Sequence, residues 1–293
     1  MRRRFQLPEE QVDAIIDNAL SEDRVTEDIT SEALIPQGLQ GKASIISKAE
    51  GTVAGCPIAG RVFLRVDPSL KVEVYIQDGS RIKPGELIAD VSGAVISILR
   101  AERVALNFLQ RLSGIASQTA EYVTRTQGFA TTILDTRKTT PGLRLLEKYA
   151  VRIGGGRNHR LHLGNGILIK DNHLAALRAL GMSLKEIVAK ARQNTPAGLK
   201  VEVEVGTIEE AQAAAEAGVD IIMLDNMSPD EMQNVVGLLP DQIKTEASGG
   251  VTVDNVRAIA RTGVNFISIG ALTHSVKALD ISLEIESQTL ELI

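Results

Sequence analysis

The feature that most constrains the fold is a repeated strand and helix pattern in the last third of the 293-residue chain. Strand-like segments begin near residues 201, 219, 243 and 264, and a helical pattern separates each pair. Capping signals at Thr207 and Ser228 and glycines at Gly218 and Gly263 mark helix starts and ends. Because strand–helix–strand units with short turns build parallel sheets, the pattern predicts an α/β fold.

Further units extend this pattern upstream. Residues 131–134 and 167–169 are apolar and predict earlier strands, and residues 183–193 and 252–261 predict helices. So many successive units favour a barrel of parallel strands over an open sheet. In such a barrel the chemistry lies at the carboxyl ends of the strands.

The first 115 residues have a different pattern. We expect a helix over residues 8–22, β pieces at 41–47, 70–76 and 86–91, and a long helix over 97–112. Turn signals such as Asp78-Gly79 separate the β pieces. This arrangement predicts an α+β domain that ends near Ser113-Gly114.

Composition excludes several classes of protein. With 32 Lys and Arg against 37 Asp and Glu, and with no Trp, the chain lacks the basic and aromatic surfaces of a nucleic-acid binder. No apolar run approaches the roughly 20 residues of a membrane span, and the basic start, Met1 to Phe5, leads to Pro8 and not to an apolar signal segment. The single cysteine, Cys56, permits no internal disulfide and is interpreted as a small buried hydrophobe. We therefore expect a cytoplasmic protein with no membrane or nucleic-acid partner.

The net charge of -5 hides a cationic segment. Residues 137–173 contain eight Lys or Arg and two acids, a net charge of +6, so the rest of the chain carries -11. Three of the four histidines also lie there. A cationic segment in an acidic protein points to a small anionic ligand.

Ionisable groups occur at or near five of the predicted strand ends. They are Asp135 with Arg137 and Lys138, then Lys170, Glu202 with Glu204, Asp225 and Glu246. Arginine and lysine side chains can bind anionic oxygens. The carboxylates Glu202 and Asp225 can hold Mg²⁺ or ribose hydroxyls, or stabilise a cation, and alternation places Glu204 on the same strand face as Glu202.

Glycine turns follow the last two strands. Ser248-Gly249-Gly250, before a helix expected from Thr252, offers backbone N–H groups and a positive helix end to a phosphate. Gly270 is placed to add another N–H group. Barrels commonly bind phosphate at these loops.

Three functions fit these residues. The first is transfer of a phosphorylated sugar to an anionic acceptor. The second is an aldolase in which Lys170 forms a Schiff base. The third is a non-enzymatic anion-binding or scaffold barrel.

Several segments together resemble one family. They are residues 22–23 and 28–31 (ED, DITS), 102–107 (ERVALN), 135–142 (DTRKTTPG), 154–160 (GGGRNHR), 169–173 (IKDNH), 225–226 (DN), 246–250 (EASGG) and 269–274 (IGALTH). From about residue 10 to the C-terminus, the chain resembles the quinolinate phosphoribosyltransferases, which are also called nicotinate-nucleotide pyrophosphorylases (carboxylating). Asn165 stands where relatives more often carry Asp, in a turn before a strand.

The resemblance implies a type II phosphoribosyltransferase of NAD biosynthesis. It would convert quinolinate and phosphoribosyl pyrophosphate, with Mg²⁺, into nicotinate mononucleotide, pyrophosphate and CO2. A relative from molybdenum-related gene clusters, with another acceptor, is the nearest alternative. The implied architecture is an α/β sandwich over residues 1–115, to which a tail of residues 275–293 returns, and an incomplete α/β barrel over residues 116–274. The implied assembly is a homodimer with shared active sites, which could associate further into a hexameric trimer of dimers.

The resemblance also implies residue roles. Catalytic roles fall to Arg103 of the partner subunit, Arg137, Lys138, Lys170, Glu202 and Asp225. Arg103, Arg137, His159 and Arg160 would bind the two carboxylates of quinolinate, and Lys138 and Lys170 would face pyrophosphate and substrate. Glu202 and Asp225 would hold the ribose and, through the phosphates, Mg²⁺. The 5′-phosphate would lie at Ser248, Gly249, Gly250 and Gly270.

Overall fold

The chain folds into two compact units. A computed structural model describes residues 7–293, so the basic start of the chain lies outside the described residues. The first unit comprises the chain up to Ala120 together with Thr139–Gly155 and Leu272–Ile293, and the second comprises Glu121–Lys138 and Gly156–Ala271. The domain ranges expected from the sequence stay a prediction. None of the described helices is long and apolar enough to cross a bilayer.

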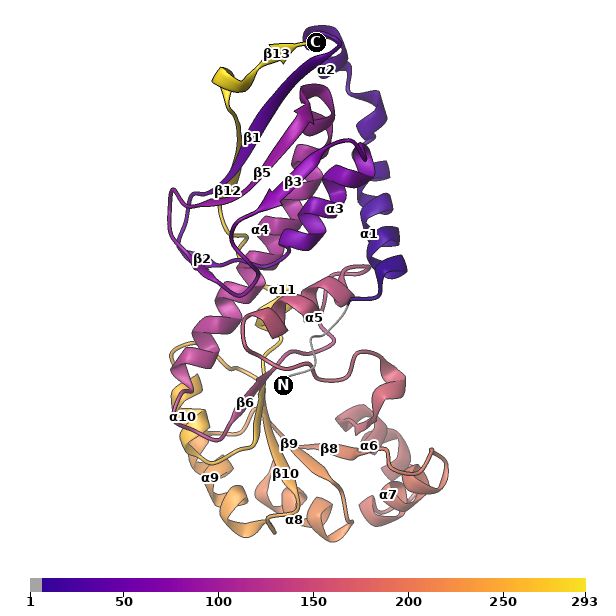
Figure 1. Cartoon of the computed structure of the whole chain (residues 1–293). Coiled ribbons are helices and arrows are strands. Elements are labelled where there is room, and N and C mark those ends of the chain that lie inside the picture. The colour runs from indigo at the N-terminus through magenta and orange to yellow at the C-terminus, as the bar shows by residue number, and fades with distance from the viewer. Residues whose placement is uncertain (1–6) are drawn as a thin grey trace. The chain divides into compact units, whose positions relative to one another are not determined.

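The first unit is built on an antiparallel sheet with the order β12-β1-β5-β3. The strands are β12 (Ile281–Ile285), β1 (Leu39–Ser47), β5 (Leu87–Ala94) and β3 (Lys71–Val74), and β13 (Glu291–Leu292) also pairs with β1. Helices α1 (Glu9–Glu22), α3 (Cys56–Val66) and α4 (Val95–Arg125) lie along one face (Figure 1). Their apolar residues, such as Ile16 and Phe63, are fully buried, and Cys56 is buried as expected. The predicted helix over residues 8–22 and the three predicted β pieces are confirmed.

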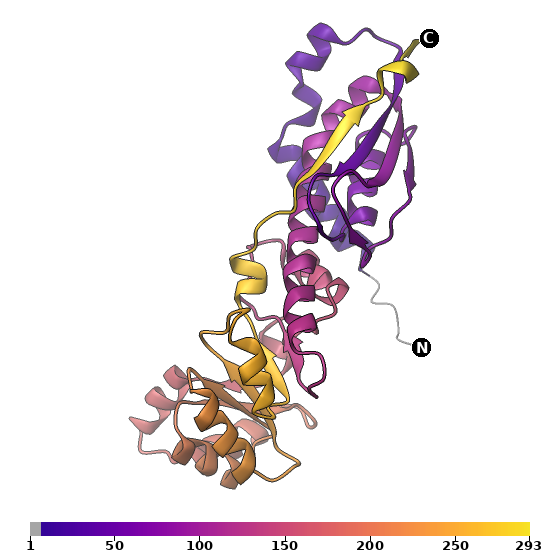
Figure 2. The ribbon, with the colours of Figure 1, turned by 90° about the vertical axis from the view of Figure 1, so that its left-hand side faces the viewer.

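Smaller elements complete the first unit. They are α2 (Ile29–Leu34), β2 (Gly51–Thr52) paired with β4 (Arg81–Ile82), α5 (Arg144–Ile153), α11 (Ala271–His274), and the 3-10 turns Val25–Glu27 and Ser287–Thr289. The C-terminal segment runs alongside the first strands of the chain, as Figure 2 shows. Ile45 of β1 has Leu283 on one side and Ala89 on the other.

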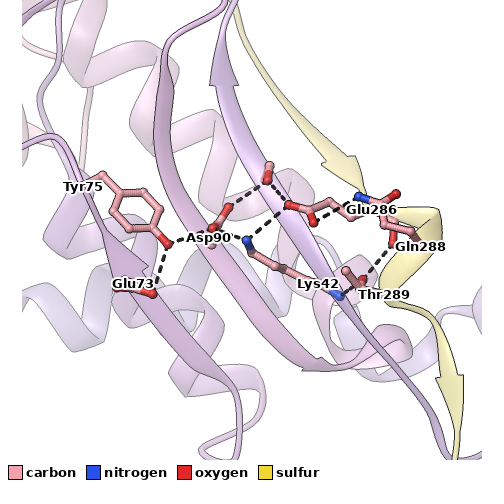
Figure 3. A network of polar contacts seen from close by, with 8 residues as sticks. Lys42, Glu73, Tyr75, Asp90, Glu286, Gln288 and Thr289 are labelled. Carbon is pink, nitrogen blue, oxygen red and sulfur yellow. Dashed lines mark hydrogen bonds and ion pairs between the residues drawn. The ribbon is translucent and has the colours of Figure 1, made fainter.

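A polar network on this sheet joins the C-terminal segment to three strands (Figure 3). The Nζ of Lys42 lies 2.6 Å from Oδ2 of Asp90 and 3.3 Å from Oε1 of Glu286. The hydroxyl of Ser44 lies within hydrogen-bond distance of both Asp90 and Glu286, and Tyr75 donates to Asp90 at 2.8 Å. Because Asp90 is buried, these donors compensate a charge that burial would otherwise disfavour.

Helix α4 is longer than the sequence predicted. It continues through Ser113 and Gly114 to Arg125, so the prediction that it ends near Leu112 is wrong. Gly114 is present because the chain passes close by, not because the helix stops there. A Cβ atom at this position would overlap the carbonyl oxygen of Lys277.

The second unit is an open α/β barrel. Six parallel strands are arranged in the order β6-β11-β10-β9-β8-β7. They are β6 (Thr132–Leu134), β11 (Phe266–Ser268), β10 (Lys244–Ser248), β9 (Ile221–Asp225), β8 (Val201–Val205) and β7 (Ile167–Ile169). The last strand, β11, pairs with the first, β6, whereas β6 and β7 do not pair in the described part of the chain. On its other edge, β6 makes one isolated parallel β-bridge, from Leu134 to Arg157. The predicted incomplete barrel is confirmed.

The barrel strands alternate between two environments. On β8, Val201, Val203 and Val205 are buried, and helix α8 packs against this strand. Glu202 and Glu204 take the other face, where they line cavities inside the barrel. A pleated strand places alternate side chains on opposite faces, so the VEVEV sequence gives one apolar and one acidic face.

Helices connect the barrel strands. They are α6 (Asp171–Arg178), α7 (Leu184–Gln193), α8 (Ile208–Glu216), α9 (Pro229–Leu238) and α10 (Val256–Arg261), with a 3-10 turn at Leu163–Asn165. Reciprocal capping boxes start α7 at Ser183 and α9 at Ser228. At Thr207 only half of the predicted box forms, because the Glu210 carboxylate accepts from the N–H of Gly206 instead. Asn165 accepts from the N–H of His162, a local turn contact.

Helix α10 starts later than predicted. The N–H of Thr252 donates to the Asn255 side chain, and the N–H of Asn255 donates to the Thr252 hydroxyl. These reciprocal bonds have the pattern of a capping box, and the Val256 N–H donates to the Thr252 carbonyl, but residues 253–255 form a turn and the regular helix begins at Val256. The regular helix thus starts four residues later than predicted, and the support of a helix end for a phosphate at Ser248-Gly249-Gly250 stays a prediction.

Candidate active site

A cavity of about 580 Å³ lies at the carboxyl ends of the barrel strands. Segments that follow or end all six strands line it. The lining residues are Thr136, Arg137, Lys138, His159, Arg160, Leu168, Lys170, Glu204, Met223, Asp225, Asn226, Glu246, Ser248, Gly249, Gly250 and Ser268. This is the edge of the barrel at which the strand-end rule places chemistry.

Most of the residues predicted for the site line this cavity. Those that do are Arg137, Lys138, His159, Arg160, Lys170, Asp225, Ser248, Gly249 and Gly250. Three others do not. Glu202 lines a second cavity of the same unit, Gly270 directly precedes α11, and Arg103 lies on α4 in the first unit with a side chain that is 60% exposed.

The diglycine turn after β10 is held against the end of β9. Both glycines have positive φ, +86° at Gly249 and +59° at Gly250, a conformation that side chains with a Cβ rarely adopt. The N–H of Asn226 donates to the carbonyl of Ser248, and the Asn255 amide donates to the carbonyl of Gly250. With its carbonyls so held, the turn can present N–H groups to an anion. Successive N–H groups in such turns form anion-binding concavities.

Glu204 and not Glu202 lies with Asp225. Oε2 of Glu204 is 3.5 Å from Nζ of Lys170, and both residues line the cavity together with Asp225. Asp225 accepts a hydrogen bond from the Asn226 side chain at 2.7 Å. The cavity therefore holds Glu204 and Asp225, besides Glu246, next to its cations, as a site for a cation-like sugar or a metal ion requires.

Glu202 does not line the site cavity and contacts His159. Nε2 of His159 lies 3.2 Å from Oε2 of Glu202 and 3.6 Å from Oε2 of Glu246. Burial disfavours a charged imidazole, but the hydrogen bond to Glu202 and the charges of both glutamates outweigh it, so the pKa of His159 is raised. Burial and the charge of Glu202 raise the pKa of Glu246.

This cluster brings three groups of metal-ligand type within 4.8 Å of one another, but its hydrogen bonds do not suit a metal ion. Nδ1 of His159 accepts the backbone N–H of Arg160 at 2.7 Å. A neutral ring with a proton acceptor at Nδ1 carries its proton on Nε2. Nε2 then donates to Glu202 and has no lone pair for a cation.

Sequence reasoning assigned no role to two residues of this region. Asp135 is fully buried and accepts from the His159 N–H at 2.8 Å and from the Asn158 amide at 2.6 Å. Glu246 is 1% exposed and faces the cluster. Both residues stand at predicted strand ends, and the spacing of Glu246, which shares a strand face with Ser248, is the signal that could have assigned it to the site.

An open α/β barrel whose strand ends gather arginines, lysines, carboxylates and a diglycine turn belongs to the class of phosphate-binding barrels. Comparison with known families defines it further. Residues 28–113 match the N-terminal domain, and residues 115–284 the C-terminal domain, of quinolinate phosphoribosyl transferase. The chain belongs to the quinolinate phosphoribosyltransferase family.

Individual relatives agree with this assignment. The chain is 46% identical to the probable nicotinate-nucleotide pyrophosphorylase (carboxylating) of Bacillus subtilis, over 94% of this chain and 93% of that one. It is 44% identical to quinolinate phosphoribosyltransferase (decarboxylating) 2, mitochondrial, of Nicotiana glauca, over 92% and 81% of the two chains. The crystal structure of NadC from Streptococcus pyogenes superimposes with a TM-score of 0.91 at 41% identity, over 98% and 99% of the chains.

Proposed function

We propose that this chain transfers the phosphoribosyl group of phosphoribosyl pyrophosphate to quinolinate, with loss of CO2, to give nicotinate mononucleotide and pyrophosphate for NAD synthesis. The observation that carries the proposal is the cavity that joins four cations, Arg137, Lys138, Arg160 and Lys170, to the Ser248-Gly249-Gly250 turn. Family membership supports it.

The cations would bind the anionic groups of both substrates. Arg137 and Arg160 would bind the carboxylates of quinolinate, since a guanidinium can hold a carboxylate through two hydrogen bonds. Lys138 and Lys170 would face pyrophosphate. His159, whose two ring nitrogens contact Arg160 and Glu202, would contribute through Arg160.

Phosphate and ribose would lie at the neighbouring strand ends. Ser248, Gly249 and Gly250, with Gly270, would receive the 5′-phosphate. Glu204 and Asp225 would face the ribose. We assign to Glu204 the ribose role that the family resemblance implied for Glu202, because Glu204 lines the cavity.

The reaction then proceeds in two stages. The pyridine nitrogen attacks the anomeric carbon as the bond to pyrophosphate breaks, and Glu204 and Asp225 stabilise the positive charge that develops on the ribose. The product is a pyridinium, which can accept electrons. The C2–carboxylate bond breaks, CO2 leaves, and the electron pair left on C2 takes up a proton.

Mg²⁺ is the proposed cofactor. Oε2 of Glu204 is buried and accepts no hydrogen bond in the described part of the chain, although Lys170 lies 3.5 Å away. Carboxylate oxygens suit this hard cation, and Asp225 supplies a second group. When bound, Mg²⁺ would neutralise charge on pyrophosphate.

We further propose a homodimer with shared active sites, in which the partner subunit's Arg103 completes quinolinate binding. Three dimers could form a hexamer. The exposure of the Arg103 side chain is consistent with a role outside its own unit. The proposed location is the cytoplasm.

Two alternatives fit less well. A Schiff-base aldolase needs an amine desolvated or activated by its surroundings, whereas Lys170 is half exposed beside Glu204. A scaffold barrel has no need of four cations converging on one cavity. A fold relative with another acceptor differs from the proposal in substrate only.

The proposal is tested by measuring pyrophosphate release with quinolinate or nicotinate as acceptor. Nicotinate lacks the second carboxylate, so we expect strong preference for quinolinate, with loss of turnover when a chelator removes Mg²⁺ and recovery when Mg²⁺ is restored. Equal rates with the two acids would contradict the substrate assignment. Trapping of Lys170 by borohydride with a keto substrate would favour the aldolase, and phosphate binding without turnover would favour a scaffold.

A further inference from the structure

A layer of charged side chains lies between two cavities of the barrel unit. The site cavity is on one side, and a second cavity of about 490 Å³ is on the other. His159, Arg160 and Glu246 line both cavities, and Glu202 lines only the second. The rest of the second cavity is lined by apolar residues, including Leu134, Ile167, Ile221 and Phe266, and by the polar residues Arg157, Asn158, Asn165 and Lys200.

The two glutamates of this layer are poorly solvated. The side chains of Glu202 and Glu246 are 5% and 1% exposed, and Oε1 of each is buried and accepts no hydrogen bond from the described residues. Burying a carboxylate without a partner is costly. The imidazole of His159 supplies a partner to both, at 3.2 Å and 3.6 Å.

The imidazole is held from its other side as well. Nδ1 of His159 accepts the N–H of Arg160, and the N–H of His159 donates to Asp135. Residues 158–160 have no helical or strand structure to fix them. The contacts that hold them include those of Asp135 with the backbone and of the two glutamates with the ring.

The position of Arg160 depends on this arrangement. Its N–H is bonded to the ring, and its guanidinium donates to the carbonyl of Gly166 at 3.0 Å. A ring that tilts or changes its protonated nitrogen would move the Arg160 backbone. Errors of about 1 Å in a binding group can cost on the order of a hundredfold in rate.

We propose that the Glu202–Glu246 pair is a positioning element, in which Glu246 is a residue with no previously assigned role. The pair fixes the Nε2–H of His159 and, through Nδ1, the place of Arg160 in the site. The expected substrate effect rests on the proposed function, because Arg160 is assigned to the carboxylates of quinolinate.

The test compares Glu246→Leu with Glu246→Gln. Leucine removes the carboxylate, and glutamine keeps the shape and an acceptor oxygen. We expect Glu246→Leu to raise the KM for quinolinate about tenfold or more and to leave the KM for phosphoribosyl pyrophosphate within about twofold. The thermal midpoint should not fall, because leucine removes the cost of burying the Glu246 carboxyl beside Glu202. Glu246→Gln should raise the KM for quinolinate less than Glu246→Leu does. The matched control is Thr245→Val. Thr245 is a buried polar residue on the same strand, and its side chain contacts Asn265 and not the His159 cluster.

A second readout does not depend on turnover. The chain has only four histidines, so ¹⁵N-histidine spectra are simple, and His159→Gln assigns the signal of interest. We expect an Nε2-protonated ring in the wild type and a changed ¹⁵N shift of His159 in Glu246→Leu. An unchanged shift and an unchanged KM for quinolinate in both variants would overturn the inference. If the wild-type protein does not turn over quinolinate, the proposed function fails, and the ¹⁵N shift still decides the positioning role.

Discussion

Nζ of Lys170 and Oε2 of Glu204 face each other at 3.5 Å across the ends of the neighbouring strands β7 and β8. Glu204 is 15% exposed and Lys170 is 50% exposed, so the lysine can reach an incoming phosphate while it compensates the carboxylate. The pair therefore links an anion-binding group to a group that can stabilise a cation.

Glu204→Gln should lower kcat by about a hundredfold, because the neutral amide no longer stabilises positive charge on the ribose. Glu202→Gln is the matched comparison on the same strand face, and its main effect should be on the KM for quinolinate through His159. Steady-state kinetics with both substrates separates the two. Equal losses of kcat in the two variants would contradict the assignment of Glu204 to the ribose.

The diglycine turn gives a second matched pair. A Cβ at Gly249 would overlap the side-chain oxygen of Asn226, whereas a Cβ at Gly250 meets no atom within 4 Å. Both alanine variants carry the positive-φ cost of about 1 kcal/mol, but only Gly249→Ala also displaces Asn226. We expect Gly249→Ala to raise the KM for phosphoribosyl pyrophosphate about tenfold or more and Gly250→Ala to raise it much less. Similar KM values for the two variants would argue against phosphate binding at this turn.

Gly114 tests the reason for a glycine in the middle of α4. Alanine normally stabilises a helix interior by about 1 kcal/mol relative to glycine. In α4 the added Cβ overlaps the carbonyl oxygen of Lys277, so Gly114→Ala should instead destabilise the protein, by roughly 1–3 kcal/mol. Gly60→Ala on α3 is the control, since its Cβ would make an ordinary contact 3.5 Å from Val72. Chemical denaturation of both variants measures the effect, and a stabilised Gly114→Ala would refute the close approach.

The network of Figure 3 predicts a loss of stability in alkali. The hydrogen bond to Asp90, with partial burial and Glu73, raises the pKa of Tyr75 from 10.0 to about 12. Between these values the folded state keeps a proton that the unfolded state has lost, so stability is present below pH 10 and falls as the pH rises toward 12. Tyr75→Phe removes this contribution. Denaturation midpoints measured across this pH range should fall less steeply in the variant, and parallel curves would exclude the effect.

Periodicity predicted the barrel because each strand and helix carries its own pattern. Alternation in VEVEV also placed Glu202 and Glu204 on one face. It could not say which one reaches the site, because depth in a barrel depends on strand stagger, a property of the whole sheet. The contact of His159 with Glu246 could not be predicted for the same reason, since the two residues are brought together only by the order of the strands in the sheet.

The errors at the helix ends have a similar origin. Ser113-Gly114 has the composition of a break, yet the glycine accommodates a distant segment at Lys277. Thr252 has the composition of a helix cap and does exchange capping bonds with Asn255, but residues 253–255 form a turn, so the regular helix begins later, at Val256. Local sequence describes what a residue prefers, and at Gly114 a tertiary contact decided the outcome.

The return of the C-terminal segment has a consequence for biosynthesis. Ser44 and Glu286, bonded across β1 and the end of β12, are 242 residues apart in the chain. All six barrel strands lie between these two residues. A chain that emerges from the ribosome from its N-terminus can pair the barrel strands before β12 exists. The sheet that starts the protein is thus the last to be completed, and its β1 edge stays open through most of translation.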